Sequence, residues 1–560
     1  MRTPASADLT GSSADSGLAQ QPAMGIARGA ALIAGLTVLS RLLGLGRTLV
    51  FSQSIGANCL GAAYVTANQV PNLIYELVLG GALTTAMVPV LARSAALAAS
   101  DPAEKARVGH ITSALLTWSI LILVPLTLVI IAVAGPIASL LTPANANAQC
   151  AHGEVVATTR SMLQVFAPQA VLYGLSVVLF GLLQAYRRFT APALAPLVSS
   201  LVLIAVYLAF VPLSKGLPLG RLPASAELVL SLGTTLGIAA LVLVALVPVW
   251  RLHLRFRPVL RFPPGVARRA GGLAAVGVIE LIAAEAASVV AIAVANGRGA
   301  TGAIVIFGYA VQVFVAMAVL ASAITVSAFP ALCAREGAVF DQTSAGSTRA
   351  VLLASWLGTA LMVAIAVPAA HVLAKQPDQV SQLIEGFVLM APGLAAVGVN
   401  TNLSRVMFAT GRLKVAAVAL AGSSLLVIVA DVVLAELAPA RLVVAALALG
   451  NTIGQTLVAI PLVIITGRIH GKKAVQGIGR TALAGLAAAA VGAAAGMAVG
   501  IALPVHHKLL AAGVALLAAV CAVIAFGVVA YILDDGDLRT ALARLRQRAT
   551  FRRTIRQQPT

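Results

Sequence analysis

The chain has 560 residues, of which 60% are hydrophobic and only 10% charged, and its formal net charge is +20. A soluble protein of this length cannot bury so much apolar surface, so the composition excludes a soluble fold. The mean hydropathy of +0.99 agrees with this. Uncharged runs such as 111–135 and 509–533 exceed the roughly 20 residues that cross a bilayer. We therefore predict an all-α polytopic membrane protein.

Apolar runs separated by charge clusters predict about fourteen transmembrane helices. Residues 1–28 are polar and are expected to form a disordered cytoplasmic tail. The first apolar run is too long for a signal peptide, so we expect an uncleaved first span. The fourteen predicted spans cover residues 29–53, 59–92, 111–136, 157–186, 191–213, 226–250, 270–296, 300–333, 350–374, 381–411, 413–436, 441–467, 481–503 and 509–533.

Most Lys and Arg residues fall in the loops on one side of this arrangement, including six arginines between 251 and 269. The positive-inside rule places this side, and both termini, in the cytoplasm, which requires an even number of spans. The tail segment 539–553 is basic with apolar positions at helical spacing, so it is expected to lie on anionic lipid. The order of spans and loops leaves no separate nucleic-acid-binding domain, so we predict no nucleic-acid partner despite the positive net charge.

Two proline landmarks recur six spans apart. Pro168 lies inside the fourth span and Pro392 inside the tenth, each about 20 residues before a basic exit. This spacing predicts a parallel repeat of two six-helix lobes, followed by two appended helices. The predicted division is a tail (1–28), an N-lobe (29–250), a basic cytoplasmic linker (251–269), a C-lobe (270–467), an appended helix pair (481–533) and a basic cytoplasmic tail (534–560).

The first span carries two arginines, Arg41 and Arg47. A buried Arg costs at least ~2.5–3.5 kcal/mol at mid-helix, so each should face a partner or a polar space. Arg41 lies about 18 Å into the span, whereas Arg47 is nearer the far end and can snorkel. Gly44 and Gly46 between them favour either close helix packing or the approach of a ligand.

The second span adds polar groups around Pro71, which we expect to break this helix: Asn68, Gln69, Asn72 and Glu76. Two interpretations are open. In the first, Glu76 forms a structural ion pair with one of the arginines of the first span. In the second, these groups line a polar, cationic site for an anionic ligand such as a diphosphate, to which Arg offers forked donors.

Three carboxylates lie within the predicted spans of the second half: Glu280, Glu285 and Asp431. Intramembrane carboxylates bind cations or relay protons, so these residues are candidates for ion coupling. For Asp431 the alternative is a position in the membrane interface near the outer end of its span. Arg405 lies near a cytoplasmic helix end and is expected to snorkel.

The four cysteines, Cys59, Cys150, Cys333 and Cys521, lack the spacing of a metal or redox motif and are expected to be packing residues. No His/Cys/Asp cluster, nucleotide loop or nucleophile elbow is present in the sequence. We therefore predict a transporter without catalytic residues, metal site or cofactor, apart from a possible coupling Na⁺ or proton.

With these residues in view, the chain resembles the MurJ/MviN family of lipid II flippases, within the multidrug/oligosaccharidyl-lipid/polysaccharide exporter superfamily. The resemblance covers roughly residues 29–470. It is carried by 40-SRLLGLGR-47, 56-GA-57, 68-NQVPNL-73, 80-GGA-82, 87-MVPVLAR-93, 187-RRFTAPALAP-196 and 328-AFPALCAR-335.

The resemblance implies two lobes around a central cavity, with residues 481–533 forming a groove for an undecaprenyl tail. It implies alternating access that moves lipid II outward across the bacterial inner membrane, driven by Na⁺, protons or the membrane potential. Cell-wall synthesis proteins are implied as possible partners. Arg41 and Arg47 match arginines that hold the diphosphate. Glu285, Asp431 and Asn451 are loose matches to residues that bind Na⁺ in some members.

The chain also departs from the family's pattern. It has Ala62 and Gly80 where many members have acidic residues, and Tyr75 and Glu76 where members have arginines. A less cationic site favours an alternative, an exporter of another polyprenyl-linked glycan. A non-transporting scaffold in envelope assembly is a further alternative. The first-span motif favours the flippase.

Overall fold

A computed structural model describes residues 23–78, 91, 94–98, 100–147, 149–261, 266–503 and 508–533. The predicted tail at 534–560, most of the predicted tail at 1–28, and the motif residues 80–82 and 87–90 lie outside the described residues. Helix α1 (Ala23–Ser54) begins before residue 29, where the first span was predicted to start. Helix α2 (Cys59–Val78) follows, and it continues through Pro71. The prediction that Pro71 breaks this helix is wrong. Proline lacks one backbone N–H donor, but a transmembrane helix can continue through it because neighbouring helices supply other partners for the freed backbone groups.

The described part of the chain is built from helices alone. The N-lobe continues with α4 (Pro102–Ala132), α5 (Ala134–Leu141), α6 (His152–Phe166), α7 (Gln169–Ala185), α8 (Thr190–Ser214), the 3-10 turn η2 (Leu219–Arg221) and α9 (Ala224–Trp250). The C-lobe comprises α10 (Val266–Arg298), α11 (Ala303–Cys333), α12 (Gly337–Ala364), α13 (Ala366–Leu373), α14 (Pro377–Met390), α15 (Gly393–Ala409), α16 (Leu413–Leu437), η3 (Ala440–Leu442) and α17 (Val443–His470). The turn η4 (Lys472–Val475) leads to α18 (Ile478–Ala502) and α19 (Lys508–Leu533).

The two lobes repeat the same succession of elements. In each, a long helix is followed by an eight-residue helix, α5 or α13. The fourth helix of each lobe is interrupted at an Ala-Pro pair, between α6 and α7 at Pro168 and between α14 and α15 at Pro392. Each lobe then has a 25-residue helix and a three-residue 3-10 turn. Proline cannot donate the helical hydrogen bond, which explains why both interruptions fall there. The predicted repeat is confirmed.

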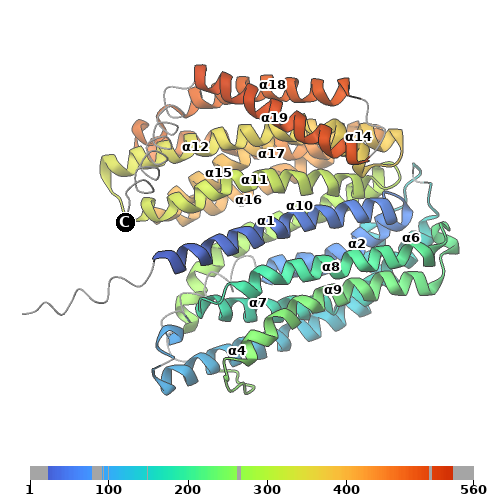
Figure 1. Ribbon diagram of the computed structural model, residues 1–560, viewed down its shortest axis with the longest axis horizontal. Helices are drawn as coiled ribbons and strands as arrows, with labels where there is room; N and C mark the ends of the chain where they lie inside the picture. Colours follow the sequence, from blue (N-terminus) through green and yellow to red (C-terminus); the bar gives the residue numbers. More distant parts are fainter. Residues whose placement is uncertain are drawn as a thin grey trace, which may run out of the picture.

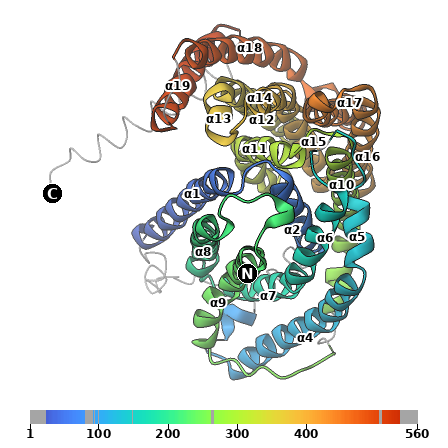
Figure 2. The ribbon, with the colours of Figure 1, turned by 90° about the vertical axis from the view of Figure 1, so that its right-hand side faces the viewer.

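Twelve helical segments of the described chain are long and apolar enough to cross a membrane, and they coincide with the predicted third to fourteenth spans. Helices α1 and α2 occupy the positions of the first two. Figure 1 shows the helices running side by side along the long axis. Figure 2 looks along them and shows the N-lobe, the C-lobe and the pair α18 and α19 at the outer edge of the C-lobe. The chain is a multi-pass membrane protein of two pseudo-symmetric six-helix lobes plus two helices.

The lobes share one apolar core at the ends where α1 stops and α2 begins. Buried side chains from both lobes meet there, including Tyr64 and Phe166 of the N-lobe and Ile306 and Phe387 of the C-lobe. Their burial removes large apolar areas from contact with lipid and water, so this end is tightly packed.

The segment that connects the two lobes is hydrogen-bonded to α4. Residues 253–261 have no regular secondary structure, and the backbone N–H groups of Arg257 and Val259 donate to the hydroxyls of Ser113 (3.2 Å) and Thr117 (3.2 Å). The Trp118 indole donates to the carbonyl of Leu260 at 3.0 Å. Helix α10 begins at Val266, so the last residues of the predicted linker, 266–269, belong to this helix. We call this end of the bundle the linker end.

At the opposite end, Cys59 and Cys150 form a disulfide between the first residue of α2 and the segment before α6. The prediction that all four cysteines are packing residues is wrong for this pair, which is separated by 91 positions. Cys333 and Cys521 are free. The signal available in the sequence was that Cys59 begins the predicted second span and Cys150 lies in the loop between the third and fourth, which places both at the side opposite the basic loops. We call this the disulfide end.

Candidate functional site

The two arginines of α1 occupy different surroundings. Arg47 is partly buried and lies within electrostatic range of three tyrosines of the N-lobe, Tyr64, Tyr173 and Tyr207. Arg41 is exposed and does not join this group. A side-chain carbon placed at Gly44 or Gly46 would meet nothing within 4 Å. The glycines therefore leave open space beside α1 and do not serve close helix packing.

Three aromatic side chains support the region of Arg47. The hydroxyl of Tyr64 in α2 lies 3.0 Å from that of Tyr207 and 2.9 Å from the hydroxyl of Thr234. Phe51 in α1 packs against both rings, with centroids 5.4 Å apart. Buried phenols need hydrogen-bond partners, and this network satisfies them while joining four helices of the lobe. The tyrosine group near Arg47 is therefore held by contacts from four helices.

The polar residues of α2 lie next to this network. Asn72 accepts a hydrogen bond from the hydroxyl of Tyr173 at 2.8 Å, and the Tyr173 ring packs on Tyr75 with centroids 4.5 Å apart. Glu76 is exposed. The side-chain oxygen of Asn68 is buried without a hydrogen-bond partner. Such an unpaired oxygen is unfavourable unless a ligand or water pairs with it.

Glu76 makes no salt bridge with an arginine among the described residues, whose ion pairs are Arg107–Glu104 and Arg298–Glu436. The interpretation of Glu76 as a structural partner of the first-span arginines is wrong. It lies within electrostatic range of Glu285 in α10 of the other lobe. Glu280 is partly buried elsewhere on α10.

Asp431 lies inside the C-lobe. Its side chain is 2% exposed, and its Oδ1 has no hydrogen-bond partner. The carboxylate faces Gly450 of α17, where the missing side chain gives it room. Asp431 is thus not exposed at the surface of the bundle, as a side chain in contact with the membrane interface would be, because α17 covers its carboxylate. Asn451, on the next position of α17, also has a buried unpaired oxygen, directed toward Gly393.

Arg405 of α15 does not simply extend to the surface. Its guanidinium lies over the ring of Phe329 in α11, 6.0 Å from the centroid. This distance is at the limit of a cation–π interaction, so the contact is weak.

The structure also reveals polar residues that the sequence analysis did not single out. At the disulfide end, amide side chains cross between the lobes: Asn145, Asn296, Gln53 and Gln379. Their signal in the sequence was weak, since amides at the ends of apolar runs are common.

These groups can bind but have no arrangement for covalent chemistry. The described residues include no group of three His, Cys, Asp or Glu side chains spaced to hold a metal ion. The guanidinium of Arg47, with amides and phenols near it, can bind a polar, anionic group.

The sequence profile of the family described as lipid II flippase MurJ matches residues 51–529. The chain belongs to the MurJ family. The match begins after Arg41 and Arg47. The assignment of these two residues to the family pattern therefore depends on the short motif of the first span, residues 40–47.

Family relatives match parts of the chain. A lipid II flippase MurJ of Burkholderia cenocepacia is 30% identical over 182 residues, which is 32% of this chain and 34% of that protein. A probable lipid II flippase MurJ of Synechocystis is 28% identical over 245 residues, 42% of this chain and 43% of that protein. These alignments thus span less than half the length of the curated relatives.

Solved structures match nearly the whole chain in fold. Lipid II flippase MurJ in an inward closed conformation has a TM-score of 0.66 at 16% identity, covering 88% of this chain and 98% of that one. An inward-facing MATE family transporter has a TM-score of 0.61 at 15% identity, covering 78% and 95%. The two-lobed architecture is therefore shared with both kinds of transporter.

Proposed function

We propose that this protein carries a polyprenyl-diphosphate-linked peptidoglycan precursor, lipid II, from the inner to the outer leaflet of the bacterial cytoplasmic membrane. The family match over residues 51–529 carries the proposal. The lobes open alternately to the two sides of the membrane, and no bond is made or broken. A transport role fits a set of binding groups that contains no catalytic constellation.

The linker end faces the cytoplasm and the disulfide end faces outward. The arginines of segment 251–261 support this orientation through the positive-inside rule. The disulfide Cys59–Cys150 supports it independently, because disulfides persist outside the reducing cytoplasm. Both chain termini are then cytoplasmic.

Arg47 binds the diphosphate, with Arg41 as a second contact nearer the linker end. Arg47 supplies planar, forked donors beside a fixed group of tyrosines, and such donors suit phosphate oxygens. The open space beside Gly44 and Gly46 gives the headgroup access to α1. Asn68, Asn72 and Glu76 are the groups of α2 that contact the polar headgroup, and α18 and α19 hold the lipid tail.

The test is complementation in a bacterium depleted of its own lipid II flippase. We expect the wild-type chain to restore lipid II at the outer leaflet, and Arg47→Ala to reduce the transport rate at least tenfold. Arg107→Ala is the matched control, since Arg107 is exposed on α4 and its ion pair within the described part of the chain is with Glu104 at 3.8 Å. An inserted wild-type chain that leaves lipid II in the inner leaflet overturns the proposal.

A second cargo, another polyprenyl-linked glycan, is favoured by one observation. Tyr75 packs on Tyr173, and Glu76 is exposed, at positions where the family resemblance calls for arginines. The site is thus less cationic than a diphosphate-pentapeptide headgroup would favour. Flipping assays in proteoliposomes, run with each lipid in turn, distinguish the two candidate cargoes. Faster transport of the other polyprenyl-linked glycan than of lipid II would identify that glycan as the cargo.

We further propose that transport is coupled to a cation, Na⁺ or a proton, at Asp431. A buried carboxylate with an unpaired oxygen is unfavourable unless it is protonated or bound to a cation. Glu280 and Glu285 are secondary candidates. Transport that persists after collapse of the Na⁺ and proton gradients and of the membrane potential removes this proposal. A role for cell-wall synthesis proteins as partners stays a prediction.

A further inference from the structure

The disulfide end carries a group of hydrogen bonds that join the two lobes. The side-chain amide of Asn145 donates to the carbonyls of Asn296 and Gly299, each at 2.8 Å. In the opposite direction, the amide of Asn296 donates to the Thr66 hydroxyl and the Leu141 carbonyl, also at 2.8 Å. Each lobe therefore presents one asparagine that is held by groups of the other lobe.

The accepting carbonyls explain why asparagines stand here. Leu141 ends α5, and Asn296 and Gly299 lie at the end of α10, where helix carbonyls lack partners within their own helix. Each amide satisfies carbonyls of the opposite lobe when the lobes are closed. When the lobes separate, water can replace every one of these neutral partners, so the contact is reversible.

Glycines bring the two backbones close enough for these bonds. A side-chain carbon at Gly297 would come within 2.7 Å of the Pro143 ring. Gly302 has a φ of +79°, and a side-chain carbon there would run into the backbone of Ala57. Both approaches cross between the lobes, so this end is closed by the Pro143 ring packed on Gly297 and by the Ala57 backbone packed on Gly302.

The disulfide anchors the segment that carries Asn145. This segment connects α5 to α6 and is described at residues 142–147 and 149–151. The Thr142 hydroxyl holds one end to α5 at 2.6 Å, and the bond between Cys150 and Cys59 holds the other end to α2. Between the two anchors, the Gln149 N–H donates to the Thr301 hydroxyl of the C-lobe at 2.9 Å.

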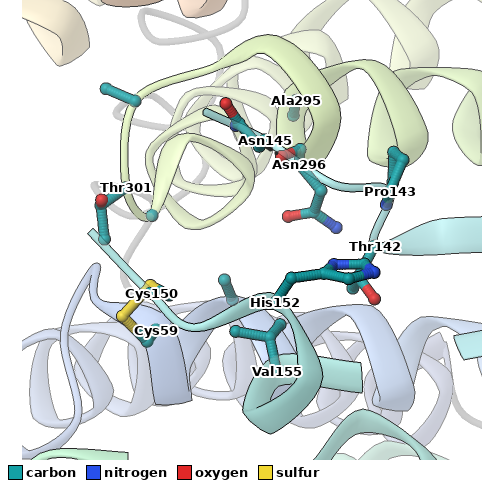
Figure 3. A pocket seen from close by; sticks show the side chains of 13 residues that line it. Cys59, Thr142, Pro143, Asn145, Cys150, His152, Val155, Ala295, Asn296 and Thr301 are labelled. Carbon is teal, nitrogen blue, oxygen red and sulfur yellow. Dashed lines mark hydrogen bonds between the residues drawn. A yellow bond between two sulfur atoms is a disulfide. The ribbon is translucent and has the colours of Figure 1, made fainter. Parts of the chain in front are cut away.

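Figure 3 shows how these groups surround a small hollow between the lobes. The disulfide lies on one side, and Asn145 and Asn296 lie across from it. The hollow measures about 50 Å³, enough for a few water molecules and too small for a cargo or drug-sized ligand. The group is therefore a contact between lobes and not a binding site.

We propose that Asn145 and Asn296 form a latch that keeps the lobes closed at the disulfide end, and that the Cys59–Cys150 disulfide holds this latch in register. Reduction of the disulfide frees one anchor of the segment, so the latch opens more often and the outward-open population rises. The proposal rests on the alternating access of the proposed function, because only that cycle requires this end to open.

Hydrogen–deuterium exchange of the full chain in lipid nanodiscs tests the latch without any cargo. We expect reduction with a phosphine to speed exchange at least fivefold in peptides covering 57–66, 142–151 and 296–302. The double variant Cys59→Ser/Cys150→Ser should show the same change without reductant, and Asn296→Ala should show it with the disulfide intact. Asn147→Ala is the control within the same segment, because the Asn147 side chain makes no hydrogen bond among the described residues and the alanine keeps the backbone N–H that donates to Asn145.

Three outcomes overturn the latch. The first is equal exchange in the oxidised and reduced protein. The second is faster exchange spread over α6 to α9, which would make the disulfide a general brace of the N-lobe. The third is an unchanged exchange pattern in Asn296→Ala. A failure of lipid flipping with the exchange shift intact overturns the proposed function alone, so the two are distinguishable.

Discussion

Tyr173 of α7 donates a hydrogen bond to Asn72 of α2 at 2.8 Å, and this contact joins the interrupted fourth span to the polar face of the second. The same tyrosine ring packs on Tyr75. One side chain thus sets the position of a predicted cargo-binding amide and of the aromatic residue beside it. Arg47 lies within electrostatic range of the same tyrosine.

Tyr173→Phe is expected to slow transport severalfold. The change removes the hydroxyl but keeps the ring, so Asn72 loses its partner at a cost of about 1 kcal/mol. Tyr75→Phe is the matched control, since the Tyr75 hydroxyl makes no hydrogen bond among the described residues. Thermal unfolding and flipping rates measured on both variants check this. Equal rates for the two variants would show that the hydroxyl of Tyr173 plays no part.

Gly450→Ala is expected to destabilise the C-lobe. A side-chain carbon there would come within 3.0 Å of the backbone nitrogen of Asp431 and collide with its carboxylate. Overpacking of this kind costs typically about 1–3 kcal/mol, so the melting temperature in detergent should fall. Gly422→Ala on α16 meets nothing within 4 Å and should be neutral or slightly stabilising. A melting temperature that is unchanged in Gly450→Ala contradicts the packing argument.

Asp431→Asn is expected to uncouple transport from the ion gradient. The amide keeps the volume but has no negative charge to balance a cation and no proton to exchange, so flipping driven by a Na⁺ or pH gradient should slow at least tenfold. Glu436→Gln is the control, because Glu436 is exposed and pairs with Arg298 at the helix ends. Gradient-driven flipping in proteoliposomes measures both. If Asp431→Asn keeps full coupling to the ion gradient, Asp431 is not the coupling site.

Gly46 offers a test of the open side of α1. Gly46→Ala should be tolerated and raise helix stability by about 0.5–1 kcal/mol, because the added carbon meets no neighbour. Gly46→Leu should leave the melting temperature unchanged and yet slow flipping at least tenfold, if the cargo approaches α1 here. The comparison needs both a thermal melt and a flipping assay. Unimpaired flipping in Gly46→Leu would place the cargo on another face.

The sequence by itself determined the span count, the sidedness of the charge and the two-fold repeat. Within a bilayer every backbone polar group must be paired inside its own segment, so helix length and position are local properties. Pro168 and Pro392 therefore marked the repeat without any knowledge of packing, and the structure places a helix interruption at each. Pro71 was expected to break its helix and does not, since the effect of a proline depends on the neighbours of α2.

Only the tertiary structure decided which distant groups meet. The disulfide joins residues 91 positions apart, and Asn145 reaches Asn296 over 151 positions. The same is true of Asp431, whose burial follows from the packing of α17 against α16 at Gly450. Hydrophobic periodicity specifies that a helix must be covered but carries no information about which residue covers it. The polar contacts between helices and lobes follow from that choice of neighbours.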